Sequence, residues 1–264
     1  MDYDAGGLAA TPPPNHIART MFKDHFSAHA AAYAKARPSY PAALLDFLAG
    51  LPERRDRAWD CGTGNGQAAI ALAERFGHVV ATDASKEQLR NAFRHPRVTY
   101  ALTTAEAAAL AAGAFDLVTA AQALHWFQPE RFFAEARRAL RRGGVVAVWV
   151  YGRPSIGDGV DAVLGRFHDV VAPFWPPERA IVEAGYRSVE FPFDEIEAPP
   201  LMLEQEWDAD AFVAYLGTWS ATRRYLQARR QDPVAPFLAE LLDRWGAGRR
   251  RTVRWPLHLR VGRP

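Results

Sequence analysis

A chain of 264 residues, of which 49% are hydrophobic, is long enough for one large globular domain or for one domain with an insertion. The formal net charge of +2 gives no strong attraction to nucleic acid or membranes, and the single cysteine, Cys61, excludes an internal disulfide and a cysteine-based metal site. No apolar run is long enough to cross a membrane, and the first residues lack the pattern of a signal peptide, so we expect a soluble, cytoplasmic protein.

The first fifty residues predict a tail and two helices. Residues 1–20 are rich in glycine and proline and are expected to form a flexible tail. One helix is expected from Met21 and a second over 42–51. His25 and His29 are spaced as zinc ligands are, but no third ligand is apparent, so we predict no metal site.

From residue 57 to residue 151, short apolar segments alternate with helical segments. The expected strands are 57–61, 78–83, 97–102, 115–121 and 145–150. The expected helices are 66–76, one from Ser85 with a capping box, one in the alanine-rich run after Glu106, and one from Pro129 to about residue 142. This order predicts an α/β fold with a doubly wound, mostly parallel sheet that binds its ligand at the carboxyl ends of the strands.

The regular alternation stops after Tyr151, where proline and tryptophan become more frequent. We expect residues 152–251 to be an inserted helical and extended segment that covers the substrate, and 21–151 with 252–264 to form the main domain. The elements expected in the insertion are helices at 158–172, from Asp208 through Tyr215 and at 236–245, and extended runs at 188–198 and 201–207. The last strand is expected at 252–261.

A glycine-rich turn, Gly62-x-Gly64-x-Gly66, follows the first expected strand. Glycines allow backbone N–H groups to approach a ligand where a helix begins. The dinucleotide pattern G-x-G-x-x-G would need a glycine where Gln67 stands. Asp60 opens the turn, and a carboxylate there repels a pyrophosphate and attracts a cationic amino or sulfonium group. The turn therefore favours S-adenosylmethionine, a small adenosine cofactor with a positive head and one carboxylate.

A second acidic residue, Asp83, ends the next expected strand about twenty positions after Gly64. A carboxylate at that point accepts hydrogen bonds from ribose hydroxyls in other doubly wound cofactor sites. The alternative interpretation is a generic turn in which the aspartate caps a helix.

Together these motifs resemble the class I S-adenosylmethionine-dependent methyltransferases. The matching signatures are Asp60–Gly66, Asp83, Ala105-Glu106 and Phe115–Val118, and three more stretches resemble the branch that includes trans-aconitate methyltransferases: Tyr33–Pro41, Ala121–Phe127 and Thr218–Ala221. The resemblance covers about residues 22–263. It implies a Rossmann-like, seven-stranded sheet whose last strand is antiparallel.

The resemblance also implies a cofactor site. The residues it places around S-adenosylmethionine, or around the product S-adenosylhomocysteine, are Tyr33, Arg37, Asp60, Gly62, Thr63, Gly64, Asn65, Gln67, Asp83, Ala84, Ala105, Glu106 and Gln122. Tyr33 and Arg37 would close over the cofactor. Thr104 stands where many class I enzymes carry the aspartate that binds the adenine amino group, so we do not expect that contact here.

His125 follows the fourth expected strand and is the candidate catalytic base. A phenol or carbon acid would need such a base, whereas a carboxylate is already ionised at neutral pH. A carboxylate would instead need cationic partners, for which Arg37, Arg223 and Arg224 are candidates. The alternative role for His125 is to cap the strand end and orient a backbone carbonyl.

The candidate substrate-binding residues are Trp149, Tyr151, Trp219 and Arg223, for which core packing or surface exposure is the alternative. The expected activity is methyl transfer from S-adenosylmethionine to a small molecule, at the oxygen of a carboxylate or hydroxyl group. We expect a monomer or homodimer that binds neither nucleic acid nor membranes. Two alternatives stay open: an inactive cofactor-binding protein that acts through a partner, and an NAD-dependent oxidoreductase, which Asp60 and Gln67 disfavour.

Overall fold

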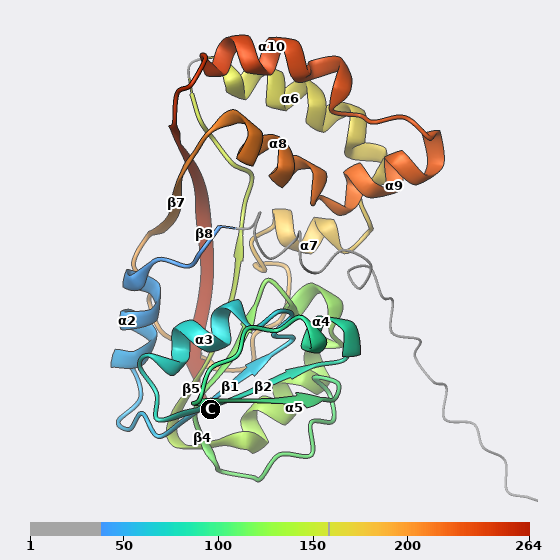
Figure 1. Cartoon of the computed structure of the whole chain (residues 1–264). Helices are drawn as coiled ribbons and strands as arrows, with labels where there is room; N and C mark the ends of the chain where they lie inside the picture. The colour runs from blue at the N-terminus through green and yellow to red at the C-terminus, as the bar shows by residue number, and fades with distance from the viewer. Residues whose placement is uncertain (1–37, 158) are drawn as a thin grey trace, which may run out of the picture.

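A computed structural model describes residues 38–157 and 159–264 and shows one eight-stranded sheet with helices on both faces (Figure 1). The expected tail, the helix from Met21 and the histidine pair lie outside the described residues. In chain order the elements are α2 (Ala42–Gly50), β1 (Arg57–Cys61), α3 (Gln67–Ala73), β2 (His78–Asp83), α4 (Lys86–Arg90), β3 (Val98–Leu102), β4 (Phe115–Ala121), η2 (Leu124–Trp126), α5 (Pro129–Ala139), β5 (Leu140–Tyr151), α6 (Val160–Val171), η3 (Ala172–Phe174), α7 (Arg179–Glu183), β6 (Asp194–Glu195), β7 (Leu201–Trp207), α8 (Ala209–Gly217), α9 (Ser220–Arg229), α10 (Ala235–Trp245) and β8 (Arg251–Arg263).

The strand order is β3-β2-β1-β4-β5-β8-β6, and β7 also pairs with β8. Neighbours from β3 to β5 are parallel, and β8 is antiparallel to β5. The predicted doubly wound, mostly parallel sheet with an antiparallel last strand is therefore confirmed. The order reverses between β1 and β4, which opens a crevice at the carboxyl ends of these two strands.

The seventh position of the sheet, at the edge beyond β8, is shared by two short strands, so that eight strands are present where seven were expected. β6 pairs with the end of β8 at Asp194↔Arg263, and β7 pairs with its beginning from Leu201↔Leu257 to Trp207↔Arg251. Residues 152–251 therefore contribute to the sheet as well as forming the layer of α6, α8, α9 and α10 at one end of it (Figure 1).

Two clusters of buried apolar side chains lie on opposite faces of the sheet. One joins α2 and α3 to β1, β4 and β5 and continues into α6, α8 and α10. The other packs α5 and the segment around α7 against the opposite face. Because alternate residues of a strand point to opposite faces, the central strands contribute to both clusters, which explains their continuous apolar sequences.

The alanine-rich run after Glu106 is not helical, contrary to the sequence prediction. Glu106 Oε1 accepts a hydrogen bond from Gln128 N at 2.9 Å, and Arg138 donates to the Leu110 carbonyl at 2.7 Å. Ala109 has a φ of 53°, which an α-helix does not allow. These contacts with α5 and with Gln128 just before it hold the run in an irregular path. They outweigh the helix propensity of the run, which contributes less than about 1 kcal/mol per residue.

Other boundaries also differ from the sequence predictions. Helix α9 was not predicted, because it is largely polar and buries only Ala221 and Thr222. The extended run expected at 188–198 contains only the two-residue strand β6. Strand β5 begins at Leu140 rather than 145, because Leu140 pairs with Phe115 before a register shift.

Within the described part of the chain, no helix combines the length and the apolar character that crossing a membrane requires. The same residues include no group of three or more His, Cys, Asp or Glu side chains placed to hold a metal ion.

Candidate active site

The glycine loop at the end of β1 has a left-handed backbone path that residues with a side chain rarely adopt. Gly62, Gly64 and Gly66 have φ values of 65°, 58° and 86°. A Cβ on Gly66 would lie 2.1 Å from the Tyr100 hydroxyl, and one on Gly62 would lie 2.7 Å from the Ala123 Cβ. The loop therefore packs closely on its neighbours at Gly62 and Gly66.

Asp60 is buried beneath the loop and does not lie open at its entrance. Its carboxylate accepts hydrogen bonds from Thr63 Oγ1 at 2.5 Å and from Thr119 Oγ1 at 2.8 Å. Burial raises the pKa of Asp60 to about 6, against the lowering effect of these two hydrogen bonds. The carboxylate thus ties the loop to β4.

Asp83 lies at the end of β2 and faces the glycine loop. Its Oδ2 accepts a hydrogen bond from Gly64 N at 2.7 Å, and its Oδ1 accepts one from Ser85 N at 2.7 Å. Asp83, which was predicted to bind the ribose, therefore lies beside the loop that was predicted to hold the other end of the cofactor. Ser85 also caps α4, as expected, by accepting a hydrogen bond from Gln88 N at 3.3 Å.

Other predicted cofactor residues surround the same loop. Gln67 Nε2 donates a hydrogen bond to the Pro38 carbonyl at 2.8 Å. Pro38, the first residue that the structure describes, therefore lies beside the residue that follows the glycine loop. Ala105 and Asn65 are buried, and Glu106 accepts a hydrogen bond from the backbone N–H of Gln128 at the start of α5. Tyr33 and Arg37 lie outside the described residues.

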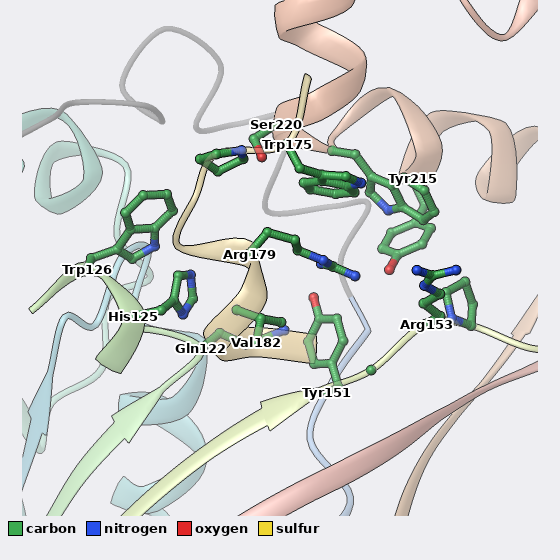
Figure 2. A pocket seen from close by; sticks show the side chains of 14 residues that line it. Gln122, His125, Trp126, Tyr151, Arg153, Trp175, Arg179, Val182, Tyr215 and Ser220 are labelled. Atoms are coloured by element: carbon green, nitrogen blue, oxygen red, sulfur yellow. The ribbon is translucent and has the colours of Figure 1, made fainter. Parts of the chain in front are cut away.

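A pocket opens at the ends of β4 and β5 (Figure 2). Its lining residues come from the ends of β4 and β5 and from residues 152–251: Gln122, His125, Trp126, Tyr151, Gly152, Arg153, Pro154, Trp175, Pro176, Arg179, Val182, Tyr215, Trp219 and Ser220. Four of the predicted site residues, Gln122, His125, Tyr151 and Trp219, therefore meet in one cavity.

Gln122 adopts a left-handed backbone conformation with a φ of 56° directly after β4. Its N–H donates to the Trp149 carbonyl at 2.9 Å, which holds the turn against β5. Non-glycine residues in this conformation are strained and gather at functional sites. The turn directs the chain towards His125 at the pocket.

His125 contacts the Tyr186 hydroxyl through Nδ1 at 3.0 Å. Burial raises the pKa of Tyr186 well above its usual range, so the phenol stays neutral. The His125 ring also lies 4.7 Å from the Trp126 ring. The imidazole is thus held from one side by its Nδ1 contact.

Trp149 and Arg223, which were predicted to bind substrate, are not among the residues that line the pocket. Trp149 is fully buried and packs edge-on against Tyr40 at 5.4 Å. It shares a face of β5 with Tyr151, but two residues deeper in the sheet, where the core covers it. Arg223 lies one turn into α9, after Trp219, and is partly buried.

The sequence analysis did not identify a charged group at the pocket, in which Arg153 and Arg179 line the cavity and Glu183 pairs with both arginines. One oxygen of Glu183 lies 3.1 Å from Arg153 Nη2 and 3.4 Å from Arg179 Nε. No single spacing rule relates the three residues, because Arg153 follows β5, whereas Arg179 and Glu183 lie one helical turn apart on α7. In the sequence, the proline- and tryptophan-rich stretch before α7 was the one signal that could have pointed to a binding surface in this segment.

Comparisons with known proteins identify relatives over most of the chain. A family model described as a methyltransferase domain matches residues 59–148. A Dictyostelium discoideum protein named as a methyltransferase is 31% identical over 228 residues, which cover 84% of this chain and 86% of that protein. The malonyl-[acyl-carrier protein] O-methyltransferase of Geobacter sulfurreducens is 28% identical over 187 residues, which cover 64% of this chain and 70% of that protein.

Among solved structures, a protein named as a type II methyltransferase from Anaeromyxobacter dehalogenans is 47% identical, with a TM-score of 0.81. The match covers 86% of this chain and 97% of that one. A doubly wound sheet with a glycine loop after β1 and an antiparallel last strand defines the class I methyltransferases. The chain belongs to this family and is an S-adenosylmethionine-dependent methyltransferase. The narrower resemblance to trans-aconitate methyltransferases stays a prediction.

Proposed function

We propose that the enzyme transfers the methyl group of S-adenosylmethionine to an oxygen of a small molecule, either a carboxylate or a hydroxyl. The observation that carries the proposal is the position of the pocket. It begins at Gln122 and His125, directly after β4, and β4 lies beside β1, which leads into the glycine loop. A cofactor on the loop would therefore present its methyl group to the pocket.

The residues around the loop suit this cofactor. The backbone of Gly62 and Gly64 would lie against its methionine end, and Asp83 would exchange a backbone hydrogen bond for the ribose hydroxyls. Asp60 would hold the loop through Thr63 rather than contact the amino group directly, since its carboxylate is fully buried. When bound, the sulfonium supplies an activated methyl group and its own leaving group. The chain then has to orient the acceptor and exclude water, and such positioning can lower a barrier by about 7–11 kcal/mol.

An oxygen acceptor is supported by the groups at the β4 end of the pocket. Gln122 and His125 can donate hydrogen bonds to an oxygen, and the aromatic walls keep water away from it. The O-methyltransferase of Geobacter sulfurreducens, a relative of this chain, also acts on oxygen, as its name states.

The test combines cofactor binding with product analysis. The full-length protein is titrated with S-adenosylhomocysteine by calorimetry, and then incubated with S-adenosylmethionine and small carboxylic acids, phenols, amines and thiols. We expect binding, and a product that gains the mass of one methyl group on oxygen. Mild alkali separates the two classes, because methyl esters hydrolyse and methyl ethers do not. Methylation confined to nitrogen, carbon or sulfur, or binding with no product, would contradict the proposal.

A variant of Asp83 tests the cofactor site itself. Asp83→Asn should weaken S-adenosylhomocysteine binding about tenfold or more, since a hydrogen bond to a charged group contributes about 1.5–3 kcal/mol. Calorimetry measures the change. Asp46→Asn, which removes an exposed partner of Arg75 beyond the end of α3 opposite to the loop, is the control and should leave the affinity unchanged. Unchanged affinity in Asp83→Asn would exclude Asp83 from the site.

A further inference from the structure

Arg179 is a poorly hydrated cation in the wall of the pocket. Only 20% of its side-chain surface is exposed, and its guanidinium lies 4.3 Å from the centre of the Trp175 ring. Its nearest acid is Glu183, one helical turn later, at 3.4 Å. An arginine that is largely desolvated binds a carboxylate more strongly than an exposed one does.

Arg153 approaches the same atom of Glu183. Its Nη2 lies 3.1 Å from Glu183 Oε1, the oxygen that also faces Arg179. His168 Nε2 lies 4.0 Å from that oxygen, but burial lowers the pKa of this histidine, so it is uncharged at neutral pH. Two guanidinium groups therefore share one carboxylate, which leaves one positive charge uncompensated within the group.

The arginines lie on the side of the pocket away from the cofactor loop. The strand order places β1, β4 and β5 side by side. Gln122 and His125 follow β4, whereas Arg153 follows β5. Figure 2 shows His125 and Arg153 on opposite sides, with the Arg179 guanidinium directed towards Tyr151 and Tyr215. The space between the two ends is bordered by aromatic rings.

We propose that Arg153 and Arg179 bind a carboxylate of the acceptor molecule that is not the group methylated. Glu183 holds both arginines and shares them with the incoming carboxylate. The proposal rests on the proposed function for the use of this site. It identifies the substrate class as small acids with a flat, apolar body and an oxygen acceptor at the opposite end.

Benzoate, a flat carboxylate without an acceptor at its other end, tests the subsite separately from methyl transfer. The full-length protein, saturated with S-adenosylhomocysteine, is titrated with benzoate while the Nε–H signals of Arg153 and Arg179 are followed by nuclear magnetic resonance. We expect saturable shifts of both signals at millimolar benzoate, and none with neutral benzamide. Equal responses to the two compounds, or no response to benzoate, would overturn the proposal.

Variants define the expected pattern further. Arg179→Gln should weaken benzoate binding at least tenfold and Arg153→Gln several-fold, while Glu183→Gln should tighten it because the competing carboxylate is gone. Arg166→Gln is the matched control, since Arg166 pairs with Glu240 away from the pocket. Unchanged affinity for S-adenosylhomocysteine checks that each variant is folded. Weaker binding in Glu183→Gln would contradict the sharing of the two arginines.

The two proposals can fail separately. Benzoate binding at the arginines without methyl transfer to any acceptor would leave the subsite intact and remove the proposed function. Methyl transfer to neutral acceptors, with benzoate leaving the arginine signals unchanged, would leave the proposed function intact and exclude the carboxylate subsite.

Discussion

The Tyr186 hydroxyl determines which ring nitrogen of His125 can carry the proton. Backbone hydrogen bonds from Leu124 and His125 act against the burial that raises the pKa of the Tyr186 phenol, which is fully buried and neutral. We infer that the oxygen accepts these hydrogen bonds and donates its own proton to His125 Nδ1, 3.0 Å away. Neutral His125 then carries its proton on Nε2 and acts as a hydrogen-bond donor, so an acceptor that is already ionised suits it better than one that needs a base.

Replacing the hydroxyl tests this assignment. In the wild-type protein the ¹⁵N signals of neutral His125 should show the Nε2–H form, and Tyr186→Phe should produce a mixture of both forms because the proton donated to Nδ1 is lost. Nuclear magnetic resonance of the labelled ring measures the ratio. Tyr100→Phe removes a hydroxyl that bonds the Phe93 carbonyl elsewhere, and it should change nothing at His125. An Nδ1–H ring in the wild type would refute the assignment.

The contribution of Asp60 to the stability of the fold depends on pH with a sign opposite to that of most carboxylates. Burial raises its pKa from 3.8 to about 6, and the charge of Asp83 acts in the same direction. The folded state therefore binds the Asp60 proton more tightly than the unfolded state does. The contribution of this group to stability rises as the pH falls from about 6 towards 4, by a free energy on the order of 3 kcal/mol.

Asp60→Asn should remove this contribution. We expect the stability of the wild type relative to the variant to increase as the pH falls from 7 to 4, a range given by the pKa of about 6 and the ordinary value of 3.8. Urea unfolding at several pH values measures the difference. Parallel pH profiles for the two proteins would show that Asp60 titrates normally.

At the scale of the elements, a buried carboxylate joins the starts of three strands. Asp116 of β4 accepts hydrogen bonds from Asp56 N and Arg57 N, both at 2.8 Å, at the beginning of β1. Its other oxygen lies 3.1 Å from Arg141 in β5. The strand ends opposite the pocket are thus fixed in register, and this register carries through to the glycine loop and Gln122 at the other ends.

Asp116→Ala should lower the free energy of unfolding by about 3–5 kcal/mol, because it leaves two backbone N–H groups without their acceptor and removes one of the two carboxylates that face Arg141, the other being that of Asp56. Urea denaturation measures the loss. The matched control is Asp46→Ala, whose ion pair with Arg75 is largely exposed on the aspartate side and should contribute at most about 1 kcal/mol. Similar losses in the two variants would mean that the Asp116 contacts do not stabilise the sheet.

At the scale of the whole molecule, the covering helices and the sheet share one hydrophobic core. A single cluster of buried side chains extends from α2 and α3 through β5 to α6, α8 and α10. Trp245 of α10 is almost fully buried and stacks on Phe212 of α8 at 5.3 Å. A continuous core predicts that the covering layer does not unfold separately from the sheet.

Trp245→Ala tests this continuity. It should lower the free energy of unfolding by about 3–5 kcal/mol, as large-to-small changes of buried aromatic residues do. Denaturation followed by tryptophan fluorescence and by far-ultraviolet circular dichroism should give coincident transitions in both proteins. Leu242→Ala, at an exposed position of the same helix, should cost much less. Two separated transitions would show that the cover is an independent unit.

The sequence by itself determined the parts of the protein that depend on local pattern. Apolar runs located the five parallel strands, most clearly the central strands β4 and β5, which are buried on both faces and are therefore largely apolar. The three glycines and Asp83 were found for a similar reason: a left-handed loop after a strand needs glycine, and the next strand end must lie beside it.

Only the tertiary structure decided what depends on contacts between distant residues. His125 and Tyr186 are 61 positions apart, and Arg153 and Glu183 are 30 apart, so no periodicity relates them. The alanine-rich run became irregular, and Trp149 became core, through packing against other elements. Local propensity amounts to a fraction of a kcal/mol per residue, and long-range hydrogen bonds and burial outweigh it wherever the two disagree.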